Sequence, residues 1–274
     1  MNHPSSCCSV CLPLFLFYTA RVVLSQISGR GLTNECSLLS PSLRLPTSST
    51  YLSLPTHRPI HFDDKIKIVA IGASNYSGKS SAIKRFVDGT FQHSEGVTIG
   101  VEFELKRVTL GNDLYKLQIW DTTGQQGMAE VTAMYARDAD VIYLGYGITN
   151  RGSFTCLKDR LRVTQCQAPQ GVVIVLVGSW CDCEDRREVS KEEGLELAAE
   201  LSAPGSASWA DIMSGARGPE SWDLTDGTVP FFEISAKEGT NIHKSFMTAA
   251  IFSAARKEGA DRSLLKRELM ALLS

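Results

Sequence analysis

The segment Ile71–Ser81 (IGASNYSGKSS) constrains the fold of this chain more than any other part of the sequence. It follows a short apolar run, Ile66–Ile71, of the length of a buried strand, and it leads into Lys79–Asp88, which is predicted to be a helix. A loop between a strand and a helix offers backbone N–H groups at the helix N-terminus, and its Gly-Lys-Ser tail adds a cation and a hydroxyl. The sequence therefore predicts a loop that cradles phosphate, a P-loop.

Within this loop, Lys79 is predicted to contact the β- and γ-phosphates, and Ser80 is predicted to bind Mg²⁺. The pattern Gly-x-x-x-x-Gly-Lys-Ser places its first glycine where Ala73 stands, and Gly72 lies one residue too early. A glycine-rich turn that binds nothing is the alternative interpretation. The residues predicted to bind phosphate from this loop are Ser77, Gly78, Lys79, Ser80 and Ser81.

After the loop, strand-like and helix-like stretches alternate. The apolar, β-rich runs are Val101–Leu110, Leu114–Asp121, Val141–Tyr146, Val172–Val177 and Val229–Ile234. Helical stretches are expected near 126–138, 153–167, 190–201 and 240–257. Gly-Asn-Asp between the first two runs predicts a hairpin. The pattern predicts an α/β fold with a mostly parallel six-stranded sheet, helices on both faces and one antiparallel strand.

Three segments do not follow this alternation. Residues 1–62 are rich in Ser and Pro and contain no Lys, which fits either a disordered extension or, more loosely, a targeting peptide. Residues 202–228 are dominated by Gly, Ser and Pro and are predicted to be an inserted surface loop at the pole opposite the ligand site. Residues 258–274 are predicted to be an amphipathic helix or tail that follows the domain at 63–257.

A second motif, Asp-Thr-Thr-Gly-Gln, closes the strand Leu114–Asp121. A carboxylate at a strand end, Asp121, can hold Mg²⁺ through water, and the backbone N–H of Gly124 can approach a γ-phosphate. Gln125 is placed to orient an attacking water. An Asp-x-x-Gly sequence alone also fits an ordinary turn, but its position after a P-loop favours the phosphate interpretation.

Five motifs, in this order along the chain, resemble the Rab-type small GTPases of the Ras superfamily across nearly all of 63–257. TIGVEF, which starts at Thr98, is similar to switch I of the family, and KLQIWDTTGQ differs from the KLQIWDTAGQ of the family only at Thr123. The other similar segments are YARDAD at Tyr135–Asp140, LGYGIT at Leu144–Thr149 with Gly147 in place of an acid, and VLVGSWCDCEDRREVS at Val175–Ser190.

The resemblance implies a Ras-like G domain that binds GTP or GDP with Mg²⁺. Thr98 would join Ser80 and Asp121 as a metal ligand, while Gln125 and Lys79 would carry catalysis. The family motif Asn-Lys-x-Asp is here Ser-Trp-Cys-Asp; in the family its Asp accepts two hydrogen bonds from guanine, its Asn ties the loop to the P-loop, and its Lys stem lies over the base. The residues implied to bind guanine are Ser179, Trp180, Asp182, Ser235, Ala236 and Lys237.

The departures in this loop predict guanine binding that is weaker than in the family. For Trp180 two interpretations stay open: its ring lies on the base, or it covers apolar surface of the loop. The charged segment Glu184–Glu188 is interpreted as a solvated loop. Rab chains end in prenylated cysteines, whereas the last cysteine here is Cys183, so we expect no prenyl-type anchoring by this chain.

The sequence thus predicts a Rab-like nucleotide switch in vesicle-mediated transport that hydrolyses GTP slowly without a partner. Effectors, an exchange factor and a GTPase-activating protein are expected at the switch regions, with indirect membrane contact. The net charge of −2 gives no reason to expect nucleic-acid binding. The expected location is cytoplasmic or peripheral to endomembranes, and residues 1–62 leave organellar targeting open. The alternative function is a pseudo-GTPase, a binding module with weak or no nucleotide binding.

Overall fold

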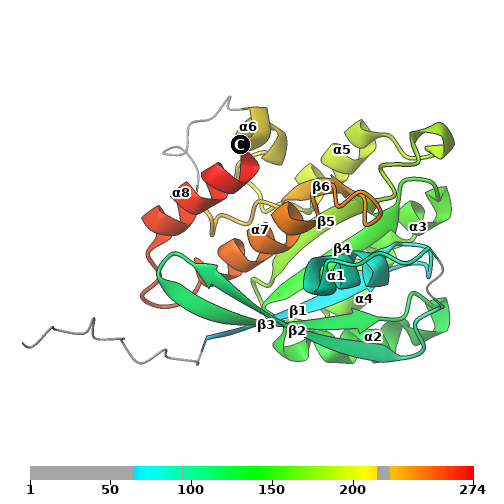
Figure 1. Cartoon of the computed structure of the whole chain (residues 1–274), viewed down its shortest axis with the longest axis horizontal. Helices are drawn as coiled ribbons and strands as arrows, with labels where there is room; N and C mark the ends of the chain where they lie inside the picture. The colour runs from blue at the N-terminus through cyan, green and yellow to red at the C-terminus, as the bar shows by residue number, and fades with distance from the viewer. Residues whose placement is uncertain (1–63, 94–95, 215–222) are drawn as a thin grey trace, which may run out of the picture. The chain divides into compact units, whose positions relative to one another are not determined.

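The computed structural model describes residues 64–93, 96–214 and 223–274, so the extension expected at 1–62 lies outside the described residues. Its centre is a six-stranded sheet with the strand order β2-β3-β1-β4-β5-β6 (Figure 1). Only β2 and β3 are antiparallel among these strands, and the other neighbours are parallel. The strands are β1 (Lys65–Gly72), β2 (Val101–Leu110), β3 (Asp113–Thr122), β4 (Val141–Gly147), β5 (Val173–Ser179) and β6 (Phe231–Ile234). The predicted sheet is confirmed.

The helices cover the two faces of this sheet. α1 packs beside α7 on one face, and α2 packs beside α4 on the other (Figure 1). No helix among the described residues is both long enough and apolar enough to cross a membrane. The helices are α1 (Lys79–Asp88), α2 (Ala129–Met134), α3 (Arg151–Thr155), α4 (Leu157–Gln165), α5 (Lys191–Leu201), α6 (Trp209–Ser214), α7 (Ile242–Ala254) and α8 (Arg262–Leu273).

A column of aromatic rings joins the sheet to α7 and α1. Tyr143 of β4 stacks on Phe246 of α7 at 4.4 Å between ring centroids, and Phe246 stacks on Phe86 of α1 at the same distance. The Tyr143 hydroxyl is 2.8 Å from the Ser245 hydroxyl, so its polar atom has a partner in the core. Because α1 starts at the P-loop, this packing fixes the direction in which the phosphate loop meets its helix.

The segment 202–228 is not simply the surface loop that its composition predicts. It contains α6, whose Trp209 is 3% exposed and donates an indole hydrogen bond of 2.7 Å to the carbonyl of Phe231. The Trp209 ring also packs against Phe232. Trp209, together with the buried Ile212 and Leu224, holds part of this Gly-Ser-Pro segment against the domain, because these side chains bury apolar surface. Phe231 begins β6, so α6 lies at the pole opposite the P-loop.

Helix α8 folds back onto the domain. Leu265 and Leu269 are buried, and the Glu268 carboxylate accepts a 2.6 Å hydrogen bond from the backbone N–H of Gly111. Gly111 lies at the turn between β2 and β3, where an added Cβ would lie 2.6 Å from Leu264. The helix therefore holds the far end of the β2–β3 hairpin through one polar contact and one close apolar contact.

Helix α5 starts with a capping box. The Ser190 hydroxyl accepts from the Glu193 backbone N–H at 3.2 Å, and the Glu193 carboxylate accepts from the Ser190 N–H at 2.9 Å. We expect Ser190→Ala to lower the free energy of unfolding by about 1 kcal/mol, because one N-terminal N–H loses its acceptor. Urea denaturation measures this difference. Ser263→Ala, at an exposed serine inside α8, is the control, and equal losses in both variants would contradict the capping role.

Candidate functional site

The predicted phosphate loop joins β1 to α1 at the C-terminal edge of the sheet. An added Cβ on Gly72, the last residue of β1, would lie 2.6 Å from the Ser77 hydroxyl and 2.8 Å from the Gly145 carbonyl. No side chain fits in this space. Gly72 therefore allows the loop to fold closely over the end of the strand, and Ala73 can follow it because the close approach occurs one residue earlier.

Lys79 is buried beneath the loop, where its ammonium donates a 2.8 Å hydrogen bond to the Ser77 hydroxyl. Burial lowers the pKa of Lys79 to about 8, and the nearby Asp121 carboxylate partly offsets this effect. The group is therefore still a cation at neutral pH. A cation that has lost most of its water is a favourable partner for a phosphate oxygen.

The three predicted metal ligands come together from three separate segments. The hydroxyls of Ser80 and Thr98 are 2.8 Å apart, and both donate to Oδ2 of Asp121. The other carboxylate oxygen, Oδ1, is buried without a hydrogen-bond partner. Burial raises the pKa of Asp121, and Lys79 and the Ser80 hydroxyl lower it in part.

Such a set fits a hard cation. Two hydroxyls and a carboxylate with a free oxygen are the ligands that Mg²⁺ prefers when it is also bound to phosphate and water. No group of three His, Cys, Asp or Glu residues that could hold a metal exists in the part of the chain that the structure describes. The oxygen set beside the P-loop is therefore the place where the described residues fit a metal best.

Gly124 lies directly against the P-loop, since an added Cβ would be 2.1 Å from the carbonyl carbon of Ser74. Its backbone N–H, which is predicted to meet a γ-phosphate, donates a 3.1 Å hydrogen bond to the Asn75 side chain. From the other side, Arg160 of α4 donates to the carbonyls of Gly124 and Gln125 at 3.2 and 2.8 Å. The start of the segment Gly124–Met134, which corresponds to switch II of the family, is thus held by contacts on both sides.

The base-recognition residues also come together. Trp180 and Asp182, after β5, and Ala236 and Lys237, after β6, line one small pocket with Ser179. Ser235 does not line it; its hydroxyl instead accepts from the Glu238 N–H at 3.0 Å and so shapes the following turn. The Ser179 hydroxyl is buried and has no hydrogen-bond partner, in keeping with the predicted loss of a tie at this position.

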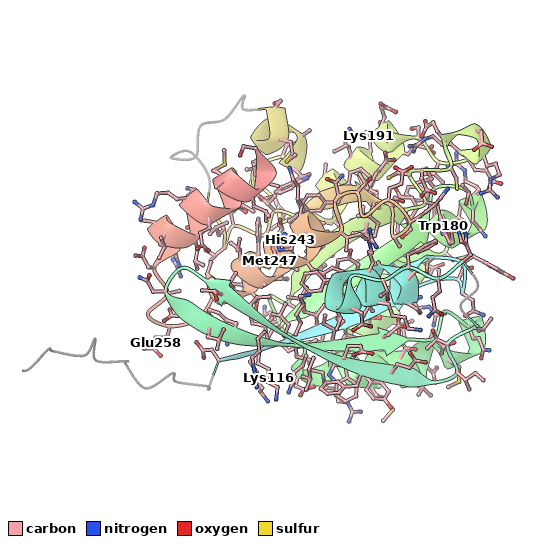
Figure 2. The ribbon with its side chains drawn as sticks, in the orientation of Figure 1. Lys116, Trp180, Lys191, His243, Met247 and Glu258 are labelled. Carbon is pink, nitrogen blue, oxygen red and sulfur yellow. The ribbon has the colours of Figure 1, made fainter. Side chains whose placement is uncertain are left out.

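A neighbouring cavity of about 260 Å³ runs from the base pocket over the P-loop to switch I. The two cavities share Gly78, Ser81, Phe91 and Trp180, so they form a continuous path from the base pocket to the metal ligands. Figure 2 shows Trp180 at one end of the domain and Glu258 at the other, which agrees with a site at the C-terminal ends of the strands.

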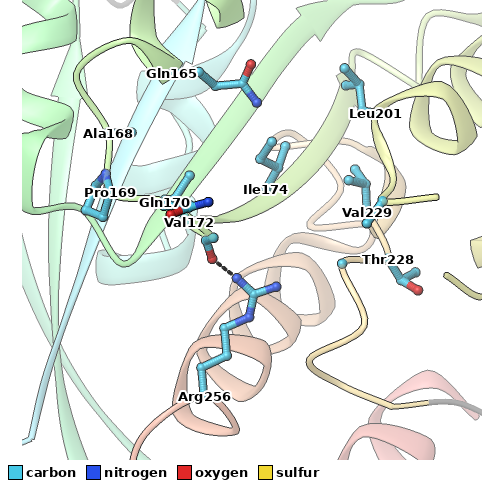
Figure 3. Close-up of a pocket in the computed structure, with 13 residues that line it drawn as sticks. Gln165, Ala168, Pro169, Gln170, Val172, Ile174, Leu201, Thr228, Val229 and Arg256 are labelled. Carbon is cyan, nitrogen blue, oxygen red and sulfur yellow. Dashed lines mark hydrogen bonds between the residues drawn. The ribbon is translucent and has the colours of Figure 1, made fainter. Parts of the chain in front are cut away.

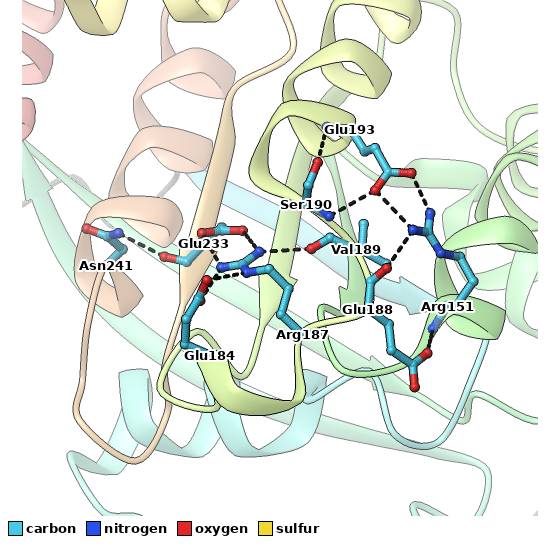
Figure 4. Close-up of polar contacts among 9 residues, drawn as sticks. All are labelled: Arg151, Glu184, Arg187, Glu188, Val189, Ser190, Glu193, Glu233 and Asn241. Carbon is cyan, nitrogen blue, oxygen red and sulfur yellow. Dashed lines mark hydrogen bonds and ion pairs between the residues drawn. The ribbon is translucent and has the colours of Figure 1, made fainter.

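The loop that carries the base-recognition residues is braced rather than freely solvated. Arg187 is 18% exposed and pairs with Glu233 of β6 at 2.6 Å and with Glu184 at 2.7 Å (Figure 4). The interpretation of Glu184–Glu188 as a solvated loop is therefore wrong for Arg187. The charged residues around Arg187 in the sequence could not reveal this contact, because Glu233, the partner of Arg187, is far away in the sequence.

A third cavity, of about 430 Å³, lies at the opposite pole (Figure 3). It is bounded by Val172, next to the start of β5, and by Val229, shortly before β6, and Arg256 donates to the Gly171 carbonyl at its edge. It contains none of the residues predicted to bind nucleotide. Its position at the N-terminal ends of the strands separates it from the site described above.

Sequence reasoning missed three residues of this site. Asn75 was treated only as part of the loop, Arg160 lies in the middle of a helix with no motif around it, and Phe91 follows the α1 helix at the edge of both cavities. Asn75 gave the only available signal, because it stands in the phosphate loop. Arg160 and Phe91 are brought to the site only by the packing of α4 and α1 on the sheet.

Comparison with known proteins agrees with this geometry. The Ras family model matches residues 67–208. The chain is 35% identical over 198 residues to Ras-related protein Rab-30 of Homo sapiens, a match that covers 72% of this chain and 84% of that protein. It is 34% identical to GTP-binding protein ypt2 of Schizosaccharomyces pombe, covering 69% and 81%, and 33% identical to Ras-related protein Rab-8B of Pongo abelii, covering 69% and 78%.

The family model covers the P-loop, the strands β2 to β5 and the predicted metal ligands. With a family model over half of the chain, and relatives above 30% identity over most of their own length, the resemblance in the motifs is confirmed. The chain belongs to the Ras family as a Rab-type small GTPase, a GTP-binding and GTP-hydrolysing protein of vesicle transport.

Proposed function

We propose that this site binds GTP or GDP together with Mg²⁺, with Ser80, Thr98 and Asp121 as the residues that hold the metal. The observation that carries the proposal is the convergence of these three side chains, with an unpartnered carboxylate oxygen, beside the buried Lys79. When bound, Mg²⁺ would neutralise charge on the phosphate oxygens. The phosphates would lie under Ser77–Ser81 and beside Gly124, and the base would lie between Trp180, Asp182 and Ala236–Lys237.

Hydrolysis in this arrangement depends on positioning and charge. Lys79 balances the charge of the phosphates, and Gln125 orients the attacking water. Arg160 lies against switch II but donates to the backbone carbonyls of Gly124 and Gln125, so it holds the loop instead of reaching the phosphate. The reaction is therefore slow in the isolated chain, and a GTPase-activating partner supplies the missing positive charge.

Regulators and effectors contact the switch regions in this family. For this chain the switch surface around Thr98–Phe103 and Gly124–Met134 would be recognised by an effector, an exchange factor and a GTPase-activating protein. We place the protein at the cytoplasmic side of endomembranes, in accordance with its Rab-type relatives.

The test is to purify the protein, identify the nucleotide that it retains by chromatography, and compare hydrogen exchange in the GDP and non-hydrolysable GTP-analogue states. We expect retained guanine nucleotide, with slower exchange at 96–100 and 122–134 in the triphosphate state, because Thr98 and Gly124 contact the metal and γ-phosphate only there. A protein that retains no nucleotide and cannot be loaded would support the pseudo-GTPase function instead.

Gln125→Leu should slow single-turnover GTP hydrolysis by about a hundredfold while leaving GDP affinity within about threefold of the wild type. Leucine cannot orient water, but Gln125 is exposed and contacts neither Lys79 nor the base pocket through its side chain. Rapid-quench measurement of phosphate release checks the rate. Gln118→Leu, within β3, is the control, and equal rates for wild type and Gln125→Leu would remove Gln125 from the mechanism.

Asn75→Ala should raise the affinity for a GTP analogue relative to GDP by about three- to tenfold, the effect of one neutral hydrogen bond. A γ-phosphate has to take the Gly124 N–H from the Asn75 side chain, whereas GDP leaves that bond in place. Competition titrations of both nucleotides measure the ratio. If the ratio is the same as in the wild type, Asn75 does not compete with the γ-phosphate.

A further inference from the structure

We call Ser179–Asp182, at the end of β5 and after it, the base loop. The base loop and the P-loop must keep a fixed spacing, because a nucleotide bridges them. In the described residues the side chain that spans this gap by a hydrogen bond is Trp180, whose indole N–H donates to the Tyr76 carbonyl at 3.2 Å. The two residues are 104 positions apart in the sequence. Neither interpretation of Trp180 from the sequence, base stacking or apolar cover, includes this contact.

The position of Trp180 is set by its surroundings and not by its own preference. Its φ of 72° lies in the left-handed region, which residues with a side chain rarely adopt. Its carbonyl accepts a 2.9 Å hydrogen bond from the N–H of Cys183, which closes the turn after β5. This turn points the indole edge toward the P-loop, and Trp180 lines both nucleotide cavities.

Gly147 provides the space for the indole. An added Cβ on Gly147 would lie 2.9 Å from the Tyr76 carbonyl oxygen and 3.3 Å from the Trp180 ring. Gly147 is the position where the family has an acid, and it pairs with Ser179 in the sheet. An acidic side chain would therefore occupy the space in which the indole meets its acceptor. Gly147 and Trp180 fit each other as a pair.

The contact also orients the phosphate loop. A peptide plane is rigid, so holding the Tyr76 carbonyl toward Trp180 turns the N–H of Ser77 to the opposite side, where it donates a 3.3 Å hydrogen bond to the Ser74 carbonyl within the loop. The neighbouring Ser179 hydroxyl is buried and unpartnered, so it supplies no comparable tie. Within the described residues, the indole thus replaces the link that the smaller serine cannot make.

We propose that Trp180 is a positioning residue for nucleotide retention: its indole N–H clamps the base loop to the P-loop, and Gly147 is the residue that makes room for it. The inference rests on the proposed nucleotide function. It explains the departures from the family at Gly147, Ser179 and Trp180 together. The indole hydrogen bond keeps the spacing of the two loops that a side-chain tie from position 179 keeps in the family.

The experiment measures the release rate of fluorescent GDP from wild type, Trp180→Phe, Gly147→Ala and the double variant. Trp180→Phe keeps an aromatic ring and removes the N–H, so we expect GDP release about three- to tenfold faster. Gly147→Ala should have a similar effect by displacing the indole. The double variant should be no faster than either single variant, because both changes remove the same contact.

Rescue distinguishes the clamp from a general loss of packing. Ser179→Asn should slow GDP release in the Trp180→Phe protein, where no tie remains, by more than it does in the wild type, where the indole already makes one. Trp180→Phe with wild-type release would identify the ring as apolar cover and overturn the clamp. So would additive effects of Trp180→Phe and Gly147→Ala.

Failure of the proposed function would give a different result. If no variant binds GDP, the nucleotide function fails, and the clamp is then decided by hydrogen exchange at 74–78 in the nucleotide-free proteins. Faster exchange in Trp180→Phe than in wild type would support the clamp on its own. Unchanged exchange would overturn it.

Discussion

Replacing Lys79 with methionine should weaken GDP binding by about a hundred- to a thousandfold, or roughly 3–4 kcal/mol, the range measured when one partner of a buried charge pair is removed. Methionine has nearly the shape of lysine but no charge. The phosphates would then enter a buried site that keeps the Asp121 carboxylate but has lost its positive charge. Among the described groups that shift the pKa of Asp121, Lys79 is the only ammonium. Calorimetric titration with GDP and Mg²⁺ measures the change.

Lys116→Met is the matched control, because Lys116 is exposed on β3 and lies away from Trp180 (Figure 2). It should bind GDP as the wild type does. Thermal unfolding of nucleotide-free Lys79→Met separates a binding defect from misfolding, since a folded variant gives one cooperative transition. A folded Lys79→Met protein with wild-type affinity would show that the phosphates do not lie over this side chain.

Replacing Asp182 with alanine should weaken GDP binding by at least about a hundredfold and remove most of the preference for guanine over adenine. In the proposed site the carboxylate would accept two hydrogen bonds from guanine, each worth roughly 1.5–3 kcal/mol because the acceptor is charged. Adenine offers no matching pair of donors, so the wild-type carboxylate would be left desolvated and poorly paired beside it. Parallel titrations with GDP and ADP measure the loss of GDP affinity and the preference for guanine over adenine.

Asp185→Ala is the control for Asp182→Ala, since it removes an exposed carboxylate from the same loop. Its GDP affinity should equal that of the wild type. An Asp182→Ala protein that still prefers GDP over ADP would place guanine recognition elsewhere in the pocket. A wild type with equal affinity for the two nucleotides would contradict the base-recognition role of the whole loop.

The strands and the first helix could be predicted from the sequence because their signals are local. Buried parallel strands appear as continuous apolar runs, and β2 and α1 have the predicted bounds. The convergence of Ser80, Thr98 and Asp121, the predicted metal ligands, could be expected because each lies in a short motif at a strand end, at a helix start or before a strand. Buried strands and phosphate loops both depend on residues that are adjacent in the chain.

The remaining features depend on contacts between distant segments. The pairing of Arg187 with Glu233, the burial of Trp209 against β6, and the indole bond from Trp180 to Tyr76 each join residues that no local pattern connects. Composition correctly marked 202–228 as unusual but could not show that one tryptophan would anchor part of it. Side-chain direction in a loop is set by the packed structure, which a single sequence does not display.

The fastening of the β2–β3 hairpin by α8 fixes the end of this hairpin that lies far from the nucleotide site. One end, at Gly111, is held by Glu268 and Leu264, while the other end leads directly to Thr98 and Gly124. Sliding by one pleat, about 7 Å, would break both the hold at Gly111 and the pairing of β3 with β1 at Lys116–Asp121, so the hairpin keeps its register in the sheet. Shortening α8 would remove the hold at Gly111 and leave the pairing with β1 in place. The far end of the hairpin would then gain freedom, while the end beside the nucleotide site would keep its position.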